Sequence, residues 1–149
     1  MKAVDLDATD LKIIDMLKTN ARMSFSDISR EIGLSTPAIR ERILNLEEEG
    51  VIKGYIPLLD NSRLGLNTTA FIGVMLAHPQ CCREDVVKAM AKIPEVVEAH
   101  FTDGEEDMLL KIVCKDTTAF LRLLSEMTAV EGVAKTRSVI SLSNEIERT

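Results

Sequence analysis

The first fifty residues repeat their apolar side chains at the three- and four-residue spacing of amphipathic helices and show little strand signal. Leu11, Ile14 and Leu17 form one such stripe, which predicts a helix from near Thr9 to near Asn20. The pattern therefore indicates that the chain opens with a helix that is apolar on one face.

A second helix is predicted between a serine cap, either Ser24 or Ser26, and Gly33. A serine hydroxyl accepts a hydrogen bond from the free amides at a helix start, and glycine adopts the left-handed backbone of a helix end. The apolar side chains that this helix is expected to bury are Phe25, Ile28 and Ile32.

A third helix is predicted to open with Thr36 as its cap and Pro37 in the first helical position, and Ser35 is the alternative cap. The pair Glu49-Gly50 ends it. Two short helices joined by a turn that contains a glycine form a helix-turn-helix. The inner stripe of the third helix is Ile39, Ile43 and Leu46.

Residues 51–59 are predicted to form a strand pair, or wing, around Lys53-Gly54. The alternative is a generic three-helix core that binds no nucleic acid. The capped helix starts, the turn glycine and the polar outer face of the third helix together favour double-stranded DNA as a partner. Residues 1–60 are therefore expected to form a winged helix-turn-helix DNA-binding domain.

The pattern changes after a polar, turn-forming stretch, residues 61–68, which is expected to be a linker. Beyond it, strand-like and helical stretches follow one another in the order βαββαβ, the ferredoxin-like arrangement. The fold class is therefore expected to be α+β, with an effector-binding and oligomerisation domain over residues 69–149. The predicted elements are residues 69–77, 84–92, 96–102, 108–114, 117–127 and 133–142.

Two of these strands, residues 71–76 and 108–113, are apolar at consecutive positions and not only at alternate ones. An antiparallel sheet with one face in water should alternate apolar and polar residues. Both helices must lie on one face of a four-stranded sheet, so the other face needs a different cover. A second copy of the chain is the simplest cover, and we expect a homodimer; the alternative is that the N-terminal domain folds back onto the sheet.

The net charge of −6 works against a nucleic-acid partner, because affinity for DNA depends on neutralised phosphates. Residues 1–60 carry eight Lys and Arg against eleven Asp and Glu, and residues 61–149 carry ten against thirteen, so each part has a net charge of −3. The DNA site must then be a local patch. We expect several copies to bind DNA at once, so that their contacts reinforce one another.

The inner stripe of the third helix leaves Pro37, Glu41 and Asn45 facing outward, with Ala38 and Arg40 at the flanks. An arginine can donate two hydrogen bonds to guanine, and a glutamate can accept one from cytosine. Basic residues outside this face are assigned to phosphates or to helix packing, and they include Arg30 and Arg42. The predicted DNA-binding residues are Arg22, Ser35, Thr36, Pro37, Ala38, Arg40, Glu41, Asn45 and Lys53.

The acidic start of the chain is unlike a secretory or transit signal, and the longest clean apolar run, residues 70–77, is too short to span a bilayer. We therefore expect a cytoplasmic protein with no membrane partner. The chain has three cysteines, Cys81, Cys82 and Cys114. Their odd number and the lack of zinc-finger spacing favour ordinary thiols. His78 beside the first two supplies too few ligands for a metal site, so neither a metal nor a cofactor is expected.

Four short motifs occur in order along the N-terminal part: Asp5-Leu6-Asp7-Ala8-Thr9-Asp10, Ala21-Arg22-Met23-Ser24, Ile32-Gly33-Leu34-Ser35 and Arg42-Ile43-x-x-Leu46-Glu47-x-x-Gly50-Val51-Ile52-x-Gly54-Tyr55. In these motifs the chain resembles the leucine-responsive/AsnC (Lrp/AsnC) family of transcriptional regulators. The second half is similar to the ligand-binding module of that family, so the resemblance covers almost the whole chain.

The resemblance implies a module that dimerises through its sheet, dimers that assemble into tetramers or octamers, and an amino acid as effector between dimers. The family loop before the third strand reads roughly Gly-Asp-Tyr/Phe-Asp. Here Gly104 and Asp107 fit that motif, whereas Glu106 takes the aromatic position and leaves the identity of the effector open. The residues expected at the effector site are Thr102, Gly104, Glu105, Glu106 and Asp107.

The residues of this loop support two interpretations. A glycine lets the backbone approach a small ligand closely, and a carboxylate suits an ammonium group. The same run of acidic residues is also typical of a solvent-exposed turn that binds nothing. Their charge favours a basic amino acid or a metal ion over an anionic effector, unless a neighbouring subunit supplies an arginine or lysine.

Two other functions compete with gene regulation. One is an enzyme, since ferredoxin-like modules occur in catalysts and some relatives of the family are sirohaem decarboxylases. Against it, His78 and His100 lack an accompanying Ser/His/Asp, Cys/His or glycine-rich phosphate motif. The other is a stand-alone amino-acid-sensing module that has lost DNA binding. Its only support is the negative net charge of residues 1–60.

Overall fold

A computed structural model describes residues 4–145 of the chain, apart from the side chains of residues 79–82. The chain forms two compact units that divide between Leu58 and Leu59. No helix in the described part is long and apolar enough to cross a bilayer. The first unit contains α1 (Ala8–Thr19), α2 (Phe25–Ile32) and α3 (Thr36–Glu48), and the second contains β1 (Thr68–Leu76), α4 (Pro79–Met90), β2 (Val96–Phe101), β3 (Met108–Cys114), α5 (Thr117–Thr128) and β4 (Val133–Ile140).

A reciprocal capping box starts α1. The Asp7 carboxylate accepts hydrogen bonds from the backbone N–H groups of Thr9 at 2.7 Å and Asp10 at 2.8 Å. The Asp10 carboxylate accepts one from the backbone N–H of Asp7 at 3.1 Å. These bonds satisfy amides that have no partner inside the helix, so α1 begins at Ala8, slightly earlier than the sequence pattern predicts.

Side chains from all three helices form the core of the first unit, and the inner stripe predicted for α3 is confirmed. The prediction that Leu11 and Phe25 are buried in this core is wrong, because Leu11 is 51% exposed and Phe25 is 39% exposed. The buried face of α1 is centred on two residues spaced four apart, which turns Leu11 toward solvent. The buried residues of this core are Ile13, Leu17, Ile28, Ile39, Ile43 and Leu46.

The ends of α2 and the start of α3 are closed by side chains and backbone geometry. Of the two predicted caps of α2 the structure has Ser24, and Gly33 ends the helix with φ of +82°, as the sequence predicts. For α3 the alternative prediction is the correct one. Ser35 is the cap, since its backbone is extended and its hydroxyl accepts a hydrogen bond from Ala38 N–H at 3.4 Å. Thr36 is already the first helical residue.

The strand pair predicted over residues 51–59 is absent from the described structure, so this prediction is wrong. After a bend at residues 51–52 the chain runs to residue 60 with neither helix nor strand. The last backbone hydrogen bond to the helices joins Ile52 N–H to the Leu46 carbonyl at 2.9 Å. A short hairpin needs a surface to pack on, and here Ile56 remains 81% exposed.

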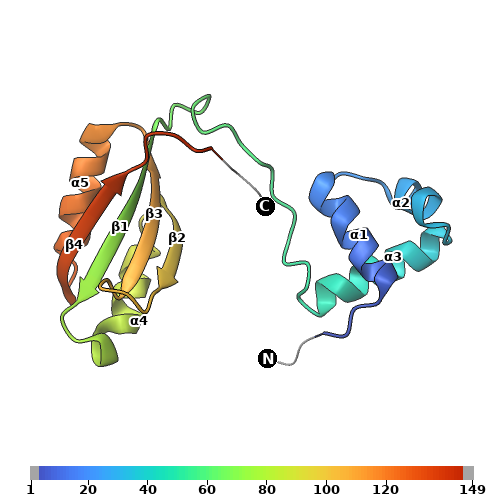
Figure 1. The fold of residues 1–149 in the computed structure, drawn as a ribbon, viewed down its shortest axis with the longest axis horizontal. Helices are drawn as coiled ribbons and strands as arrows, with labels where there is room; N and C mark the ends of the chain where they lie inside the picture. Colours follow the sequence, from blue (N-terminus) through green and yellow to red (C-terminus); the bar gives the residue numbers. More distant parts are fainter. Residues whose placement is uncertain (1–3, 146–149) are drawn as a thin grey trace. The chain divides into compact units, whose positions relative to one another are not determined.

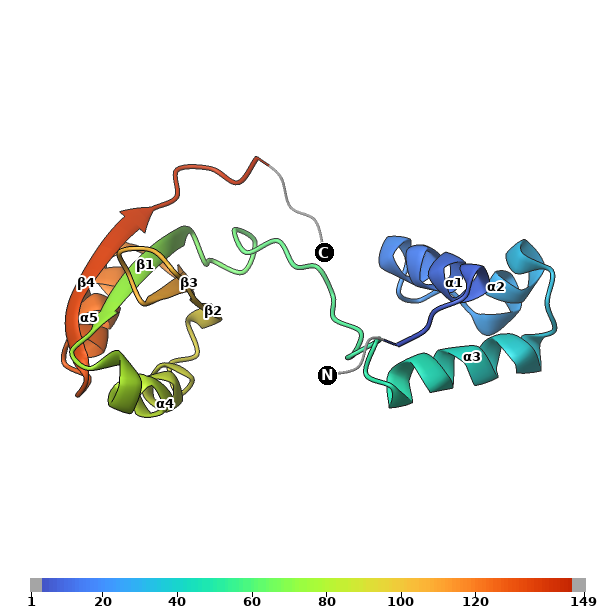
Figure 2. The same cartoon turned by 60° about the horizontal axis from the view of Figure 1, so that its bottom comes forward.

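The second unit is a four-stranded antiparallel sheet with the strand order β2-β3-β1-β4. Both of its helices, α4 and α5, lie on the same face of the sheet (Figure 1; Figure 2). The predicted α+β class and the βαββαβ order are confirmed. Strand β3 has the predicted limits, whereas α4 begins at Pro79 and not at Glu84, because proline is favoured in the first turn of a helix.

The two faces of the sheet differ in what covers them. On β1 the alternate residues Ala70, Ile72 and Val74 are fully buried in the core with α4 and α5. On the opposite face Phe71 is 39% exposed, and Val139, its partner in the register of β1 and β4, is 60% exposed. One apolar face of the sheet is therefore left uncovered by the described residues of the second unit.

Candidate functional site

The first turn of α3 combines backbone amides with exposed side chains. Ser35, Thr36 and Pro37 are exposed, and Ala38 is half-buried. The amides at a helix start carry partial positive charge and attract anions. This turn is therefore suited to contact a phosphate group or an acceptor on a base edge.

A shallow hollow follows the outward face of α3 beyond that turn. Within the described residues, the exposed guanidinium of Arg40 has no ion pair or hydrogen bond. A possible partner, Glu47, instead accepts a hydrogen bond from the Tyr55 hydroxyl at 2.8 Å. Burial and this bond raise the pKa of Tyr55 to about 12. The hollow is lined by Thr36, Pro37, Arg40, Glu41, Leu44, Asn45 and Glu48.

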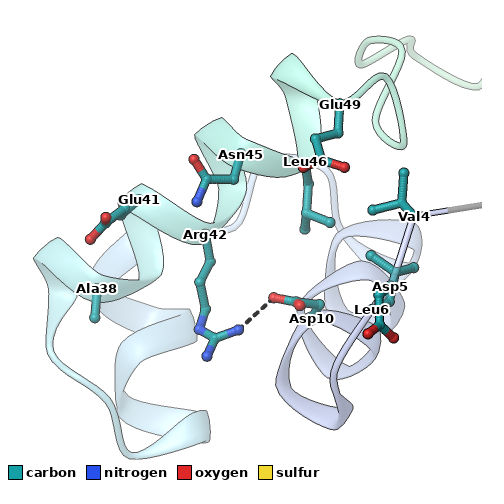
Figure 3. Close-up of a pocket in the computed structure, with 10 residues that line it drawn as sticks. All are labelled: Val4, Asp5, Leu6, Asp10, Ala38, Glu41, Arg42, Asn45, Leu46 and Glu49. Carbon is teal, nitrogen blue, oxygen red and sulfur yellow. Dashed lines mark hydrogen bonds and ion pairs between the residues drawn. The ribbon is translucent and has the colours of Figure 1, made fainter.

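Arg42 points in a different direction and is held inside the unit. Its guanidinium Nη1 donates to Asp7 Oδ2 and to Asp10 Oδ1, at 2.7 Å each, and Figure 3 shows the second of these contacts. These two carboxylates raise the pKa of Arg42. The pKa of Asp7 is lowered, first by the backbone hydrogen bond from Asp10 and then by Arg42. Of the two roles predicted for Arg42, the structure supports helix packing.

A second hollow lies between the N-terminal segment and α3 (Figure 3). Asp5, Glu41 and Glu49 line it, and the guanidinium of Arg42 is neutralised by Asp10. A surface with this excess of carboxylates repels phosphates. The outward hollow has fewer carboxylates, Glu41 and Glu48, and its cation Arg40 is not held by one of them, so of the two hollows it suits DNA better.

The two other basic residues predicted to bind DNA are not part of either hollow. Arg22 is exposed in the turn between α1 and α2, where its backbone N–H donates to the Asn20 side chain at 3.0 Å. Lys53 is exposed in the irregular segment after α3. Both are free to meet a phosphate, but the structure does not bring them into the hollow with Arg40.

The acidic loop between β2 and β3 is closed by its own hydrogen bonds. The Thr102 hydroxyl donates to the carbonyl of Glu106, and Thr102 N–H donates to the carbonyl of Asp107 at 3.1 Å. Asp107 Oδ2 accepts from the backbone N–H of Leu76 at 2.7 Å, next to the point where the pairing of β1 with β4 shifts register. Asp107 thus satisfies an amide of β1 that lies beyond the last pair of the β1–β3 ladder, Val74 with Met108.

Glu106 folds from this loop across the open face of the sheet. A Cβ placed on Gly73 would lie 2.4 Å from Glu106 Cγ, so the side chain occupies the space that the glycine leaves. Arg137, the partner of Gly73 on β4, donates from Nη1 to Glu106 at 3.3 Å and to Glu105 at 3.4 Å. The loop that the sequence predicts to be purely acidic therefore has a cation of the same chain beside it.

Two residues of these surfaces were not predicted from the sequence. Arg137 is 32 residues from Glu105, and only the strand register brings them together. No local motif indicates that contact. The helical period turns Leu44 away from Ile43 and the inner stripe, but an apolar side chain carries no local signal of a DNA contact. The structure leaves Leu44 40% exposed in the outward hollow, while Ile43 is 1% exposed.

The described residues contain no group of three or more His, Cys, Asp or Glu side chains that could hold a metal ion. The side chains of Cys81 and Cys82 lie outside the part of the chain that the structure describes. Cys114 is a free, buried thiol, and burial raises its pKa, which disfavours the reactive thiolate. His100 is exposed on β2 and contacts Glu98 at 3.2 Å, and Glu98 also accepts from Lys111 at 2.8 Å. This arrangement is a surface ion pair between Lys111 and Glu98 with His100 beside it.

Two family models match the chain. Residues 69–149 match the Lrp/AsnC ligand binding domain, and residues 6–53 match a winged helix-turn-helix DNA-binding domain. Within the described residues the helix-turn-helix is present, while no strand follows it before β1.

Several known proteins are similar to this chain over nearly their whole length. The HTH-type transcriptional regulator Rv2324 of Mycobacterium tuberculosis is 33% identical, covering 96% of each chain. The leucine-responsive regulatory protein of Rhizobium meliloti is 36% identical, covering 93% of this chain and 90% of that protein. The crystal structure of the transcriptional regulator NMB0573 from Neisseria meningitidis, a complex with L-Met, superposes with a TM-score of 0.91 at 31% identity, covering 97% of this chain and 95% of that one.

Proposed function

The chain belongs to the Lrp/AsnC family of transcriptional regulators, and on this basis we propose which of its surfaces bind DNA, the effector and a second copy. We assign residues 1–60 to operator DNA and residues 69–149 to the effector and to self-association. Like its relatives, the chain acts by regulating transcription and not by catalysis.

The N-terminal turn of α3 enters the major groove of duplex DNA, as recognition helices do. One observation carries this assignment: Arg40 is exposed and without a partner in the described structure, whereas Arg42 is held by two carboxylates. Arg40 then reads guanine, and Glu41 accepts from cytosine. The remaining contacts come from Ser35, Thr36, Pro37, Ala38 and Asn45 in the groove, with Arg22 and Lys53 on phosphates.

The open face of the sheet joins two copies of the chain. Phe71, Leu109 and Val139 expose apolar surface there, and among the described residues of this unit neither α4 nor α5 covers it. A two-fold axis brings the same apolar patch of a second copy against it. Two helix-turn-helix units in one assembly add their DNA contacts, which compensates for the net charge of −6. Tetramers or octamers are built from such dimers.

The effector is an amino acid bound at the loop between β2 and β3. The related NMB0573 regulator was crystallised with L-Met, which motivates this class of ligand. An amino acid carries one carboxylate and one ammonium group, and the complementary groups are Arg137 on β4 and Glu105 and Glu106 in the loop. Thr102, Gly104 and Asp107 complete the site, with Asp107 holding its shape through Leu76 N–H.

The proposal is tested by selecting DNA with the full-length protein. Random duplexes are enriched in the absence of ligand and in the presence of the twenty pooled amino acids. We expect a two-fold symmetric motif whose recovery changes when one amino acid is present. An enrichment without any sequence motif contradicts the assignment of α3, and a motif that no amino acid affects contradicts the assignment of the loop.

A further inference from the structure

Leu44 is an exposed apolar side chain among the mainly polar residues that line the outward hollow of α3. It follows Arg40 by four residues and Pro37 by seven, so the three lie on one face of α3. Isolated exposed leucines are common on protein surfaces, and exposure by itself has no functional meaning. Leu44 differs because it lines the same hollow as Arg40, the guanidinium that our proposed function assigns to guanine.

The major groove of DNA offers one apolar group to a leucine, the 5-methyl group of thymine. The other groups on the base edges there are hydrogen-bond donors, hydrogen-bond acceptors or small C–H groups, and none offers a leucine as much apolar surface as the methyl group. We propose that Leu44 is a specificity-determining residue that contacts a thymine methyl group beside the guanine contacted by Arg40. This inference rests on the proposed function, because it requires α3 to lie in the groove.

The spacing along the helix limits where that thymine lies. Residues four apart are separated by about 6 Å along the axis of an α-helix, and successive base pairs by about 3.4 Å. The thymine therefore lies within about two base pairs of the guanine, on either strand. One turn beyond Leu44 is Glu48, whose carboxylate repels phosphates. The DNA contacts of α3 accordingly end with Leu44 and its neighbour Asn45, before Glu48.

The experiment removes one methyl group at a time from the DNA. The operator is first selected with the full-length protein, and each thymine near the guanine is then replaced in turn by deoxyuridine, which lacks only the 5-methyl group. Affinities are measured for the wild type and for L44A at matched salt. Alanine is the best helix former and leaves α3 intact, as the helical circular dichroism will show.

At one thymine per half-site, deoxyuridine is expected to weaken wild-type binding about fourfold, the effect of about one buried methyl group. L44A is expected to lose at least that factor on the thymine operator and to be insensitive to deoxyuridine at that position. The matched control is L11A, which removes a 51% exposed leucine from α1 and should respond to deoxyuridine as the wild type does.

Three results would overturn the inference. The first is a selected operator without thymine within about two base pairs of the guanine. The second is equal affinity of wild type and L44A, and the third is a full deoxyuridine penalty that persists in L44A. Failure of the proposed function looks different, because then no motif is enriched or Arg40→Ala binds the selected operator as tightly as the wild type.

Discussion

Arg42 of α3 and Asp10 of α1 form an ion pair at 2.7 Å, and the Asp10 side chain is only 15% exposed. Asp10 also closes the capping box that starts α1, so one carboxylate serves both the helix start and the contact between helices. The orientation of α3, and with it the direction of Arg40, therefore depends on a cation that does not itself face outward.

Replacing Arg42 should destabilise the first unit. R42A leaves Asp7 and Asp10 without their cation and removes the packed stem of the arginine, which we expect to cost about 1–2 kcal/mol of unfolding free energy. Denaturant unfolding followed by helical circular dichroism measures it. The matched control is R30A, which breaks an exposed pair with Asp27 and should cost less than about 0.5 kcal/mol. Equal losses in the two variants would contradict the role given to Arg42.

The contribution of Asp7 should depend on pH. Its pKa lies below the ordinary value of 3.8 in the folded chain, because the backbone hydrogen bond from Asp10 and the Arg42 guanidinium favour the carboxylate. The stabilisation is therefore complete above pH 3.8 and is lost as the pH falls through the lower, folded-state pKa. Asp7→Asn keeps a capping residue without the charge. Wild type should be more stable than this variant at neutral pH and equal to it in strong acid, and a pH-independent difference would refute the attribution.

Arg40→Ala should weaken binding to a selected operator by about 1–3 kcal/mol per half-site and relax the base preference at one position. Lys53→Ala provides the contrast, because loss of a phosphate contact should weaken all sequences alike and flatten the dependence of affinity on salt. Competition binding at several salt concentrations separates the two patterns. Unchanged affinity and base preference in Arg40→Ala would show that this arginine is only a solvated surface residue.

Val139→Glu should break the association of copies. Val139 is 60% exposed on the open sheet face, so a carboxylate there is tolerated in a single chain but is buried without a partner in a dimer. Leu121→Glu is the control, since Leu121 is 62% exposed on α5, away from that face. Light scattering at micromolar concentration should give at least a dimer for wild type and for Leu121→Glu, and a lower mass for Val139→Glu. A wild type of one chain mass would refute the dimer.

Arg137→Ala should remove the cation that we assign to the effector carboxylate. We expect amino-acid binding, measured by calorimetry, to weaken by about tenfold or more, since a charge-assisted hydrogen bond is worth about 1.5–3 kcal/mol. Arg122→Ala, on the exposed part of α5, is the control and should leave binding unchanged. Asp107→Ala should also weaken binding, because it releases Leu76 N–H. If no amino acid binds the wild type more tightly than millimolar, the site assignment is wrong.

The limits of helices and strands could be predicted from the sequence wherever residues close together in the chain determine them. The apolar run of β3 ends at polar turns on both sides. Gly33 ends α2 with φ of +82°, a backbone conformation that glycine adopts without steric strain, and a serine precedes both α2 and α3. The prediction over residues 51–59 was wrong because a strand pair needs neighbouring surface, and no local pattern shows whether one is there. The exposure of Leu11 likewise depends on which face of α1 packs against α2 and α3.

The sequence by itself determined the element order, the inner stripe of α3, the apolar strands and the acidic loop, because each depends on residues close together in the chain. Only the tertiary structure decided what the charged residues of these elements face. It turned Arg42 onto Asp7 and Asp10 and left Arg40 outward, and it placed Arg137 beside Glu105 and Glu106 over Gly73. The physical reason is that an ion pair needs atoms within about 4 Å, and for residues about thirty positions apart only helix packing and strand register set that distance.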